Sequence, residues 1–171
     1  GTVLGLATWN VYLVYGASYW RQVFSIPVTT TAIAMIFTVL SYTAGSLLAG
    51  RFTKRLGFRR LLLVTTGALG GITFFVFNAP SFWVSFGLAV VASFFAGMMI
   101  TVSSSFSLEQ IPKFRGTMMS LHSTAVSTGG TLSAAMGGLI LVAYSYGTYS
   151  IAMGFMGLAG ALAYMLLTSE P

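Results

Sequence analysis

Long apolar segments separated by short polar breaks dominate this sequence and limit the folds open to it. Six such segments lie at residues 2–19 or a little beyond, 28–50, 60–78, 81–108, 115 or 117 to 144, and 148–168. A membrane-spanning helix needs about 20 mainly apolar residues, whereas a strand of a membrane barrel is shorter and alternates in polarity. The segments therefore predict an all-α integral membrane protein with six transmembrane helices.

The shortage of charged residues supports the same class. Charged residues make up 6% of the 171 residues and hydrophobic residues 56%, whereas about a quarter of a soluble domain is charged. Such a chain cannot cover a surface that faces water, but a surface that faces lipid needs no such cover. The net charge of +6 does not indicate a nucleic-acid partner, because seven of the eight lysines and arginines lie in two short loops and only Arg21 lies elsewhere.

The basic residues orient the predicted helices. Short loops rich in lysine and arginine lie on the cytoplasmic side of a membrane, so both termini are expected on that side too. The opposite surface is then expected to carry an interfacial aromatic belt. The basic loop residues are Arg51, Lys54, Arg55, Arg59, Arg60, Lys113 and Arg115, and the expected belt residues are Trp20, Trp83, Tyr146 and Tyr149.

The order of the predicted helices divides the chain into two units. Residues 1–78 and 80–171 would each hold three helices, and the two units would run through the membrane in opposite directions. This is the topology of a three-plus-three inverted repeat. We therefore expect one six-helix domain over residues 1–171, built from two repeat units.

Two predicted helices carry polar faces. In the first, Thr8, Tyr12 and Tyr15 recur at helical spacing, and Asn10 is the one amide deep in the span. That face either lines a substrate cavity or holds helices together by hydrogen bonds. The fifth helix either packs closely on another helix, the commoner use of small residues, or lines water. Its face consists of Ser120, Thr124, Ser127, Thr131, Ala134 and Gly138.

Titratable side chains are too few for most catalytic or metal sites. His122 lies about two turns into the fifth helix, where it either handles a proton and gates or holds a neighbouring carbonyl as a neutral imidazole. No cysteine, second histidine or buried carboxylate accompanies it, so neither a metal nor another cofactor is expected. A serine nucleophile turn and a phosphate-binding loop are also missing, so no enzyme is expected.

The basic loop also resembles the signature of a known family. Gly50-x-x-x-Lys54-Arg55-x-Gly57-x-Arg59-Arg60 resembles the loop signature of the major facilitator superfamily, in which the position of Lys54 is usually aspartate. Without this acid, the clamp on neighbouring helix ends is missing. The remaining roles are close helix approach at Gly50, a tight turn at Gly57 and contact of the arginines with anionic lipid.

A second segment resembles the start of the family's eleventh helix in drug and sugar efflux members. It reads Glu109-x-x-Pro112-x-x-Arg115-Gly116 and continues into the glycine pairs at 129–130 and 137–138. Glu109 is also the only acid near the basic loops. It is expected to pair with Arg115 or with one of Arg51, Arg55 and Arg59.

The resemblance implies helices seven to twelve of a secondary transporter that exports a drug, sugar or metabolite, as an antiporter, by alternating access. Its first and fourth helices would line the cavity, at Thr8, Asn10, Tyr12, Tyr15, Ser93, Gly97 and Thr101. The second and fifth would meet a second six-helix half, in the same polypeptide or a dimer mate, and the third and sixth would face lipid. A prokaryotic plasma membrane is the expected location. The alternative function is a membrane scaffold or receptor built on the same helices.

Overall fold

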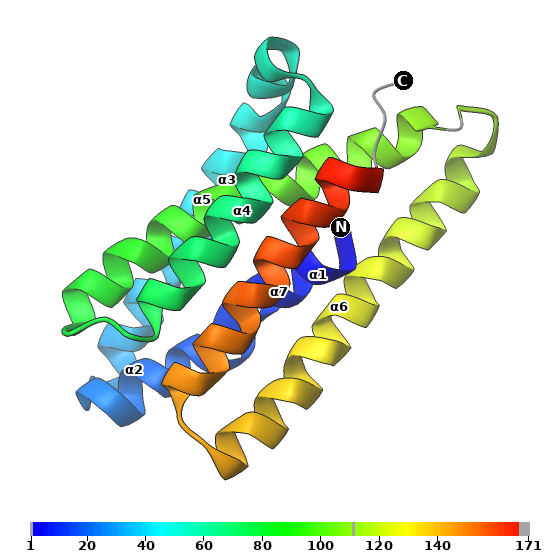
Figure 1. The fold of residues 1–171 in the computed structure, drawn as a ribbon. Coiled ribbons are helices and arrows are strands. Elements are labelled where there is room, and N and C mark those ends of the chain that lie inside the picture. The colour runs from blue at the N-terminus through cyan, green and yellow to red at the C-terminus, as the bar shows by residue number, and fades with distance from the viewer. Residues whose placement is uncertain (1, 111, 168–171) are drawn as a thin grey trace.

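A computed structural model describes residues 2–110 and 112–167, and this part of the chain is almost entirely helical (Figure 1). The described residues contain no β-strand. In chain order the elements are α1 (Thr2–Val11), the π-helical segment η1 (Tyr12–Gly16), α2 (Ala17–Phe24), α3 (Val28–Leu56), α4 (Phe58–Val76), α5 (Phe82–Gln110), the 3-10 turn η2 (Pro112–Phe114), α6 (Arg115–Ala143) and α7 (Tyr146–Leu167).

Five helices, α3 to α7, are long and apolar enough to cross a membrane, which confirms five of the six predicted spans. The first predicted span is also helical, over residues 2–24, but η1 divides it into pieces that are each shorter than a span. A π-helical turn interrupts the regular hydrogen-bond ladder, and such turns are frequent at functional sites. Thr168, the predicted end of the last span, lies outside the described residues.

The predicted loop between the second and third spans is wrong, because α3 continues to Leu56. Residues 51–56 contain neither glycine nor proline, and the arginines, lysine and leucine among them are good helix formers. Basic side chains also interact favourably with the C-terminal end of a helix. The chain turns only at Gly57, whose φ of 79° suits glycine and confirms the predicted tight turn.

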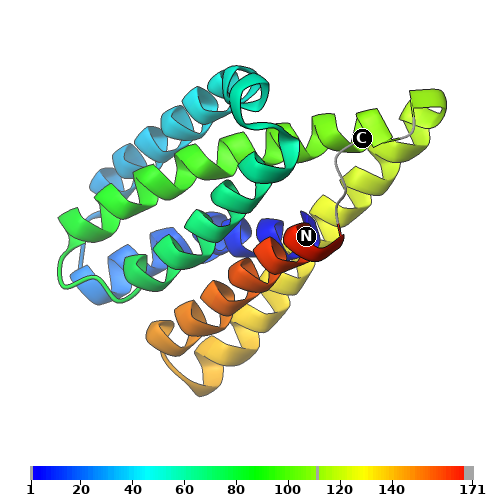
Figure 2. The same ribbon diagram turned by 45° about the horizontal axis from the view of Figure 1, so that its top comes forward.

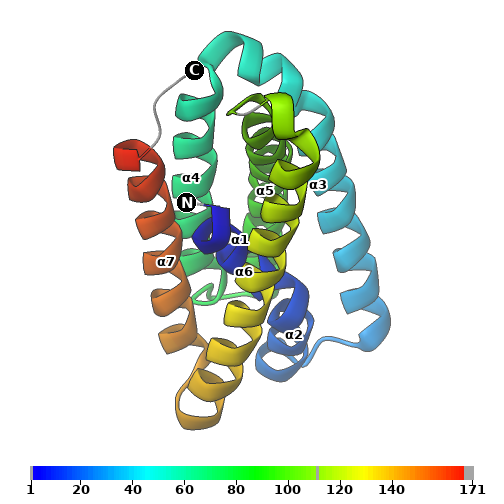
Figure 3. The same ribbon diagram turned by 90° about the vertical axis from the view of Figure 1, so that its right-hand side faces the viewer.

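The bundle is held by pairs of helices in close contact. α3 packs along α5, α4 packs along α5 and α7, and α1 packs along α6 and α7 (Figures 1 and 3). A Cβ atom at Gly45 would lie 2.0 Å from the carbonyl oxygen of Phe94, and one at Gly97 would lie 2.0 Å from that of Tyr42. These glycines therefore bring the α3 and α5 backbones into contact. Figure 2 shows α3 along one edge of the bundle and α6 and α7 along the other.

Two residues of the expected aromatic belt are buried instead. Trp20 and Tyr149 are 2% and 0% exposed, whereas Trp83 is 74% exposed. Trp20 lies inside the bundle because the first helix continues to Phe24, and its indole nitrogen donates a 2.8 Å hydrogen bond to the Ser85 hydroxyl. The partner satisfies the one polar atom of the buried ring.

Candidate functional site

An exposed polar face runs along α6. The opposite face of this helix is buried, and a Cβ atom at Gly129 would lie 2.7 Å from the backbone oxygen of Val3 in α1. Within the described part of the chain, Tyr15 touches this face near Ala134 and Gly138, and the rest of the face is uncovered. Its exposed members are Ser120, Ser123, Thr124, Ser127, Thr128, Thr131, Ala134 and Gly138. Most of the predicted stripe on this helix is therefore not packed within the described chain.

The hydroxyls of this face bond to their own helix. Those of Thr124, Thr128 and Thr131 each donate to the carbonyl four residues earlier, at 2.8–3.0 Å. Each hydroxyl oxygen keeps lone pairs that accept further hydrogen bonds. The middle of the face, at Ser123, Thr124, Ser127, Thr128 and Thr131, is open. Ser123 and Thr128 also belong to this face, although they were not predicted from the sequence. Ser123 lies four residues before Ser127 and Thr128 three residues before Thr131, and this helical spacing could have identified them.

Two predicted cavity residues of the first helix border this polar face. The hydroxyl of Tyr15 donates a 2.8 Å hydrogen bond to the carbonyl of Ala134. Asn10 donates to the Leu6 carbonyl at 2.9 Å, and its side-chain oxygen lies 3.6 Å from where a Cβ atom of Gly130 would be. Hydroxyl, amide and phenol groups from two helices are thus gathered on one side of α6. Such groups offer hydrogen bonds without adding a charge inside the membrane.

The other five predicted cavity residues lie between helices. Thr8 bonds to the carbonyls of Leu4 and Met153, and Tyr12 donates to the Thr73 hydroxyl at 2.8 Å. Their role in substrate binding stays a prediction, because in this conformation each contacts a neighbouring turn or helix. The other three residues lie in α5. Ser93 donates to the Ala89 carbonyl, and Gly97 lies against the α3 backbone. The Thr101 hydroxyl lies 2.7 Å from the Ser46 hydroxyl.

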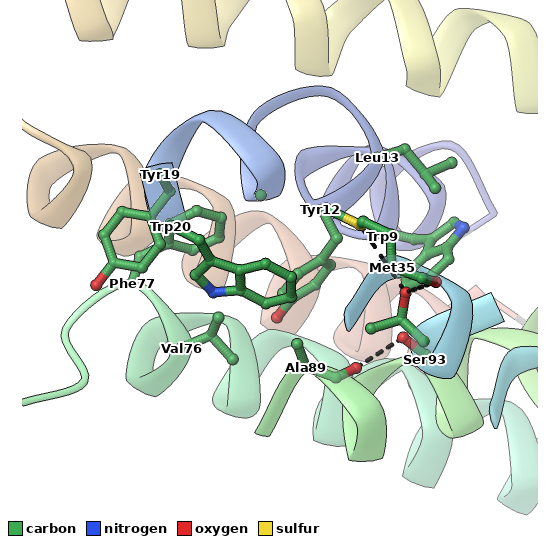
Figure 4. Close-up of a pocket in the computed structure, with 12 residues that line it drawn as sticks. Trp9, Tyr12, Leu13, Tyr19, Trp20, Met35, Val76, Phe77, Ala89 and Ser93 are labelled. Carbon is green, nitrogen blue, oxygen red and sulfur yellow. Dashed lines mark hydrogen bonds between the residues drawn. The ribbon is translucent and has the colours of Figure 1, made fainter. Parts of the chain in front are cut away.

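An aromatic cluster fills the space beside Tyr12 (Figure 4). Trp9 stacks on Tyr42 at a ring distance of 5.6 Å, and Tyr12 lies 5.8 Å from Phe77. The cavity left among these rings, Met35 and α5 is about 10 Å³, close to the lower limit for one water molecule. This cluster therefore acts as packing around η1 and does not hold a solute in this conformation.

The signature residues lie at the end of α3, at the turn residue Gly57 and at the start of α4. Arg55 and Arg60 are exposed, and Arg59 donates a hydrogen bond to the carbonyl of Met165 in the last turn of α7. The close approach expected at Gly50 is wrong, because a Cβ atom there would meet nothing within 4 Å. Gly50 is exposed, and it is not at the helix end, because α3 continues past it to Leu56.

The helix-start segment is arranged as the sequence predicts, but the predicted ion pair is not found. α5 ends at Gln110, Pro112 begins the short turn η2, and α6 starts at Arg115. Gly116 is exposed. Glu109 is exposed and lines a hollow of about 360 Å³ with Lys54. Among the described residues it makes no ion pair with an arginine. It faces the end of α3, where Lys54 and not Arg51 or Arg55 shares its hollow.

His122 lies on the buried face of α6, at 8% exposure. Its Nδ1 atom is buried and has no hydrogen-bond partner among the described residues. Its predicted gating role stays a prediction. No group of histidine, cysteine and acidic side chains that could bind a metal occurs in residues 2–110 and 112–167.

These features define an integral membrane protein whose spanning helices carry an exposed polar face. The family model of the Major Facilitator Superfamily matches residues 1–171, so the chain belongs to this family of secondary transporters. The family resemblance drawn from the loop signature is thereby confirmed, and the family consists of transporters and not enzymes. No curated protein and no solved structure matches the chain.

Proposed function

We propose that this chain is one six-helix half of an efflux-type antiporter for a small molecule such as a drug, sugar or metabolite. It works by alternating access against a second half, supplied by the same polypeptide or a dimer mate. The observation that carries this proposal is the exposed polar face of α6, bordered by Asn10 and Tyr15. A polar face in the middle of a membrane-spanning helix requires either a protein partner or water.

A three-plus-three inverted repeat, over residues 1–78 and 80–171, accounts for the helix contacts. The repeat would relate the divided first helix to α5, α3 to α6, and α4 to α7. The contact of α3 with α5 at Gly45 then has a counterpart in the contact of α6 with α1 at Gly129. α4 and α7 would be counterparts, and they cross each other where Gly70 meets Gly157. In this scheme the divided first helix also crosses the membrane, which together with α3 to α7 makes six spans.

The middle of α6 is the proposed substrate-facing part. Ser127 and Thr131 lie there, beside Asn10 and Tyr15 of the first helix. The ends of the same face, at Ser120 and Gly138, would pack against the second half, because small residues allow close helix approach. Ser93, Gly97 and Thr101 would contact substrate only if the α3–α5 contact opens during the cycle.

The orientation follows from charge. The basic turn, from Arg51 in the last turns of α3 to Arg60 in the first turn of α4, carries Arg51, Lys54, Arg55, Arg59 and Arg60. We place it on the cytoplasmic side of a prokaryotic plasma membrane, where it meets anionic lipid. α7 ends at the same side, because Arg59 contacts Met165. Both chain ends would then be cytoplasmic.

Transport by the complete transporter, reconstituted in liposomes, tests the proposal. Asn10→Ala and Thr131→Val are expected to lower the initial rate of solute transport, because each removes a hydrogen-bonding group from the polar face. Thr43→Val is the matched control, since Thr43 bonds to its own helix among exposed Val39, Leu40 and Leu47. Unchanged rates in the first two variants would contradict the proposed path. Transport by this chain alone as a monomer would contradict the need for a second half.

A further inference from the structure

An apolar furrow lies on the outer side of the bundle, between α4 and α7. Its volume is about 230 Å³, which is below the range of drug-sized ligand pockets. It is lined by Gly70, Gly71, Phe74, Phe75, Ile151, Gly154, Phe155 and Leu158. None of these side chains has a polar atom, so only hydrocarbon is a suitable occupant.

Glycines create the furrow. A Cβ atom at Gly70 would lie 2.9 Å from the backbone nitrogen of Leu158, and one at Gly157 would lie 2.6 Å from the Cα of Gly70. The two helices therefore meet at their backbones, and the missing side chains leave a depression above the crossing. Phe74, Phe75 and Phe155 are 40%, 60% and 68% exposed. Their rings stand beside this depression as broad apolar walls.

The furrow lies in the half of the membrane away from the basic turn. At a rise of about 1.5 Å per residue, Gly70 is about 18 Å from the start of α4 at Phe58 and about 9 Å from its end at Val76. Gly154 is likewise about 12 Å from the start of α7 at Tyr146. One leaflet contributes about 15 Å of hydrocarbon. Lipid chains of the leaflet opposite the basic turn therefore run beside the furrow.

None of the described side chains that line the furrow, including those at its end beside the α4–α5 connection, is charged. There the α4–α5 connection meets the start of α7 through a 2.8 Å hydrogen bond from Asn78 to the Ser150 hydroxyl. Trp83 and Tyr144, 74% and 70% exposed, mark this end as a membrane interface. The arginines at the start of α4 are at the other end. A lipid in the furrow would thus be held through its hydrocarbon and not through the charge of its headgroup.

We propose that the α4–α7 furrow seats one acyl chain of a phospholipid from the leaflet opposite the basic turn. The chain fills the depression over Gly70 and Gly154 and packs between the phenylalanine rings. The binding is selective for hydrocarbon and indifferent to headgroup charge. This proposal rests on the membrane location of α4 and α7 and is independent of transport.

Native mass spectrometry of the purified protein, released from detergent after incubation with dioleoyl phosphatidylcholine or dioleoyl phosphatidylglycerol, tests it. Gly71→Leu fills the furrow without a clash, because a Cβ atom there meets nothing within 4 Å. Gly87→Leu is the matched control, since its Cβ would also meet nothing, and it lies at a similar depth beside exposed Trp83 and Val84 on α5. Gly71→Leu is expected to lower the bound-lipid fraction about tenfold through lost packing contacts, and Gly87→Leu to leave it unchanged.

Both lipids are expected to bind the unmodified protein equally. The proposal is overturned if Gly71→Leu and Gly87→Leu lose the same amount of bound lipid, or if both keep all of it. A clear preference of the protein for phosphatidylglycerol would also overturn it, because the bound lipid would then lie at the arginines at the start of α4. A dimer that carries no lipid and is lost in Gly71→Leu would show that a second copy of the chain covers the furrow instead.

Discussion

The guanidinium group of Arg59 donates a hydrogen bond to the backbone carbonyl of Met165, and so joins the start of α4 to the last turn of α7. The carbonyls of a last helical turn have no partner within the helix, and they carry the negative end of the helix dipole. A family-signature arginine thus satisfies the end of another helix. This contact fixes two neighbouring helices at the basic end of the bundle.

Replacement of Arg59 by methionine should therefore destabilise the protein. The variant keeps much of the side-chain length but loses the donor and the charge, and we expect the free energy of unfolding to fall by about 1 kcal/mol. Chemical unfolding in mixed detergent micelles measures this. Arg60→Met is the control, because Arg60 is the exposed neighbour in the same turn. Equal effects of the two substitutions would show that the contact with Met165 contributes nothing.

A side chain at Gly45 should separate α3 from α5. Its Cβ atom would lie 2.0 Å from the Phe94 carbonyl oxygen, so one backbone must move. We expect Gly45→Ala to lower the free energy of unfolding by about 3 kcal/mol. Gly87→Ala should cost little, since a Cβ atom there meets nothing within 4 Å. If both alanines are tolerated in the same unfolding assay, the backbone contact between α3 and α5 is not present.

The Tyr12–Thr73 hydrogen bond should contribute a measurable coupling. The bond is 2.8 Å long and buried, and it joins η1 to α4. In a double-mutant cycle with Tyr12→Phe and Thr73→Val, the coupling free energy is expected to be about 0.6–1 kcal/mol, the usual size for bonds between membrane helices. A coupling of zero would indicate that the two hydroxyls do not interact in the membrane.

Apolar length and glycine position predicted most of the helices. Five of the spans follow from length and hydrophobicity alone, and Gly57 marked the turn after α3. The sequence did not predict the extension of α3 through Arg51, Lys54 and Arg55, because a charge-rich segment between two apolar ones is typical of a loop. Helix propensity continued α3 beyond its apolar part. The π-helical segment at Tyr12–Gly16 was also missed, since it depends on how that helix packs and not on local sequence.

The faces of the helices were harder to predict than their positions. The family resemblance implied that Ser93, Gly97 and Thr101 line a cavity, but the sequence did not show that α3 covers them through Gly45 and Tyr42. The polar stripe on α6 was found, although its partner was not. A stripe of small polar residues is compatible with packing or with water, and only the positions of the other helices distinguish the two.

Accessibility of Thr131 to water tests the central claim most directly. This chain contains no cysteine, so a cysteine at this position, in a transporter whose second half also carries none, reports on its own surroundings. In the complete transporter in native membranes, Thr131→Cys is expected to react with a membrane-impermeant maleimide. Leu40→Cys, near the middle of α3 among exposed apolar residues, is expected to remain unmodified. If Thr131→Cys is as unreactive as Leu40→Cys, with both variants present in equal amounts, the polar face of α6 does not line a solute path.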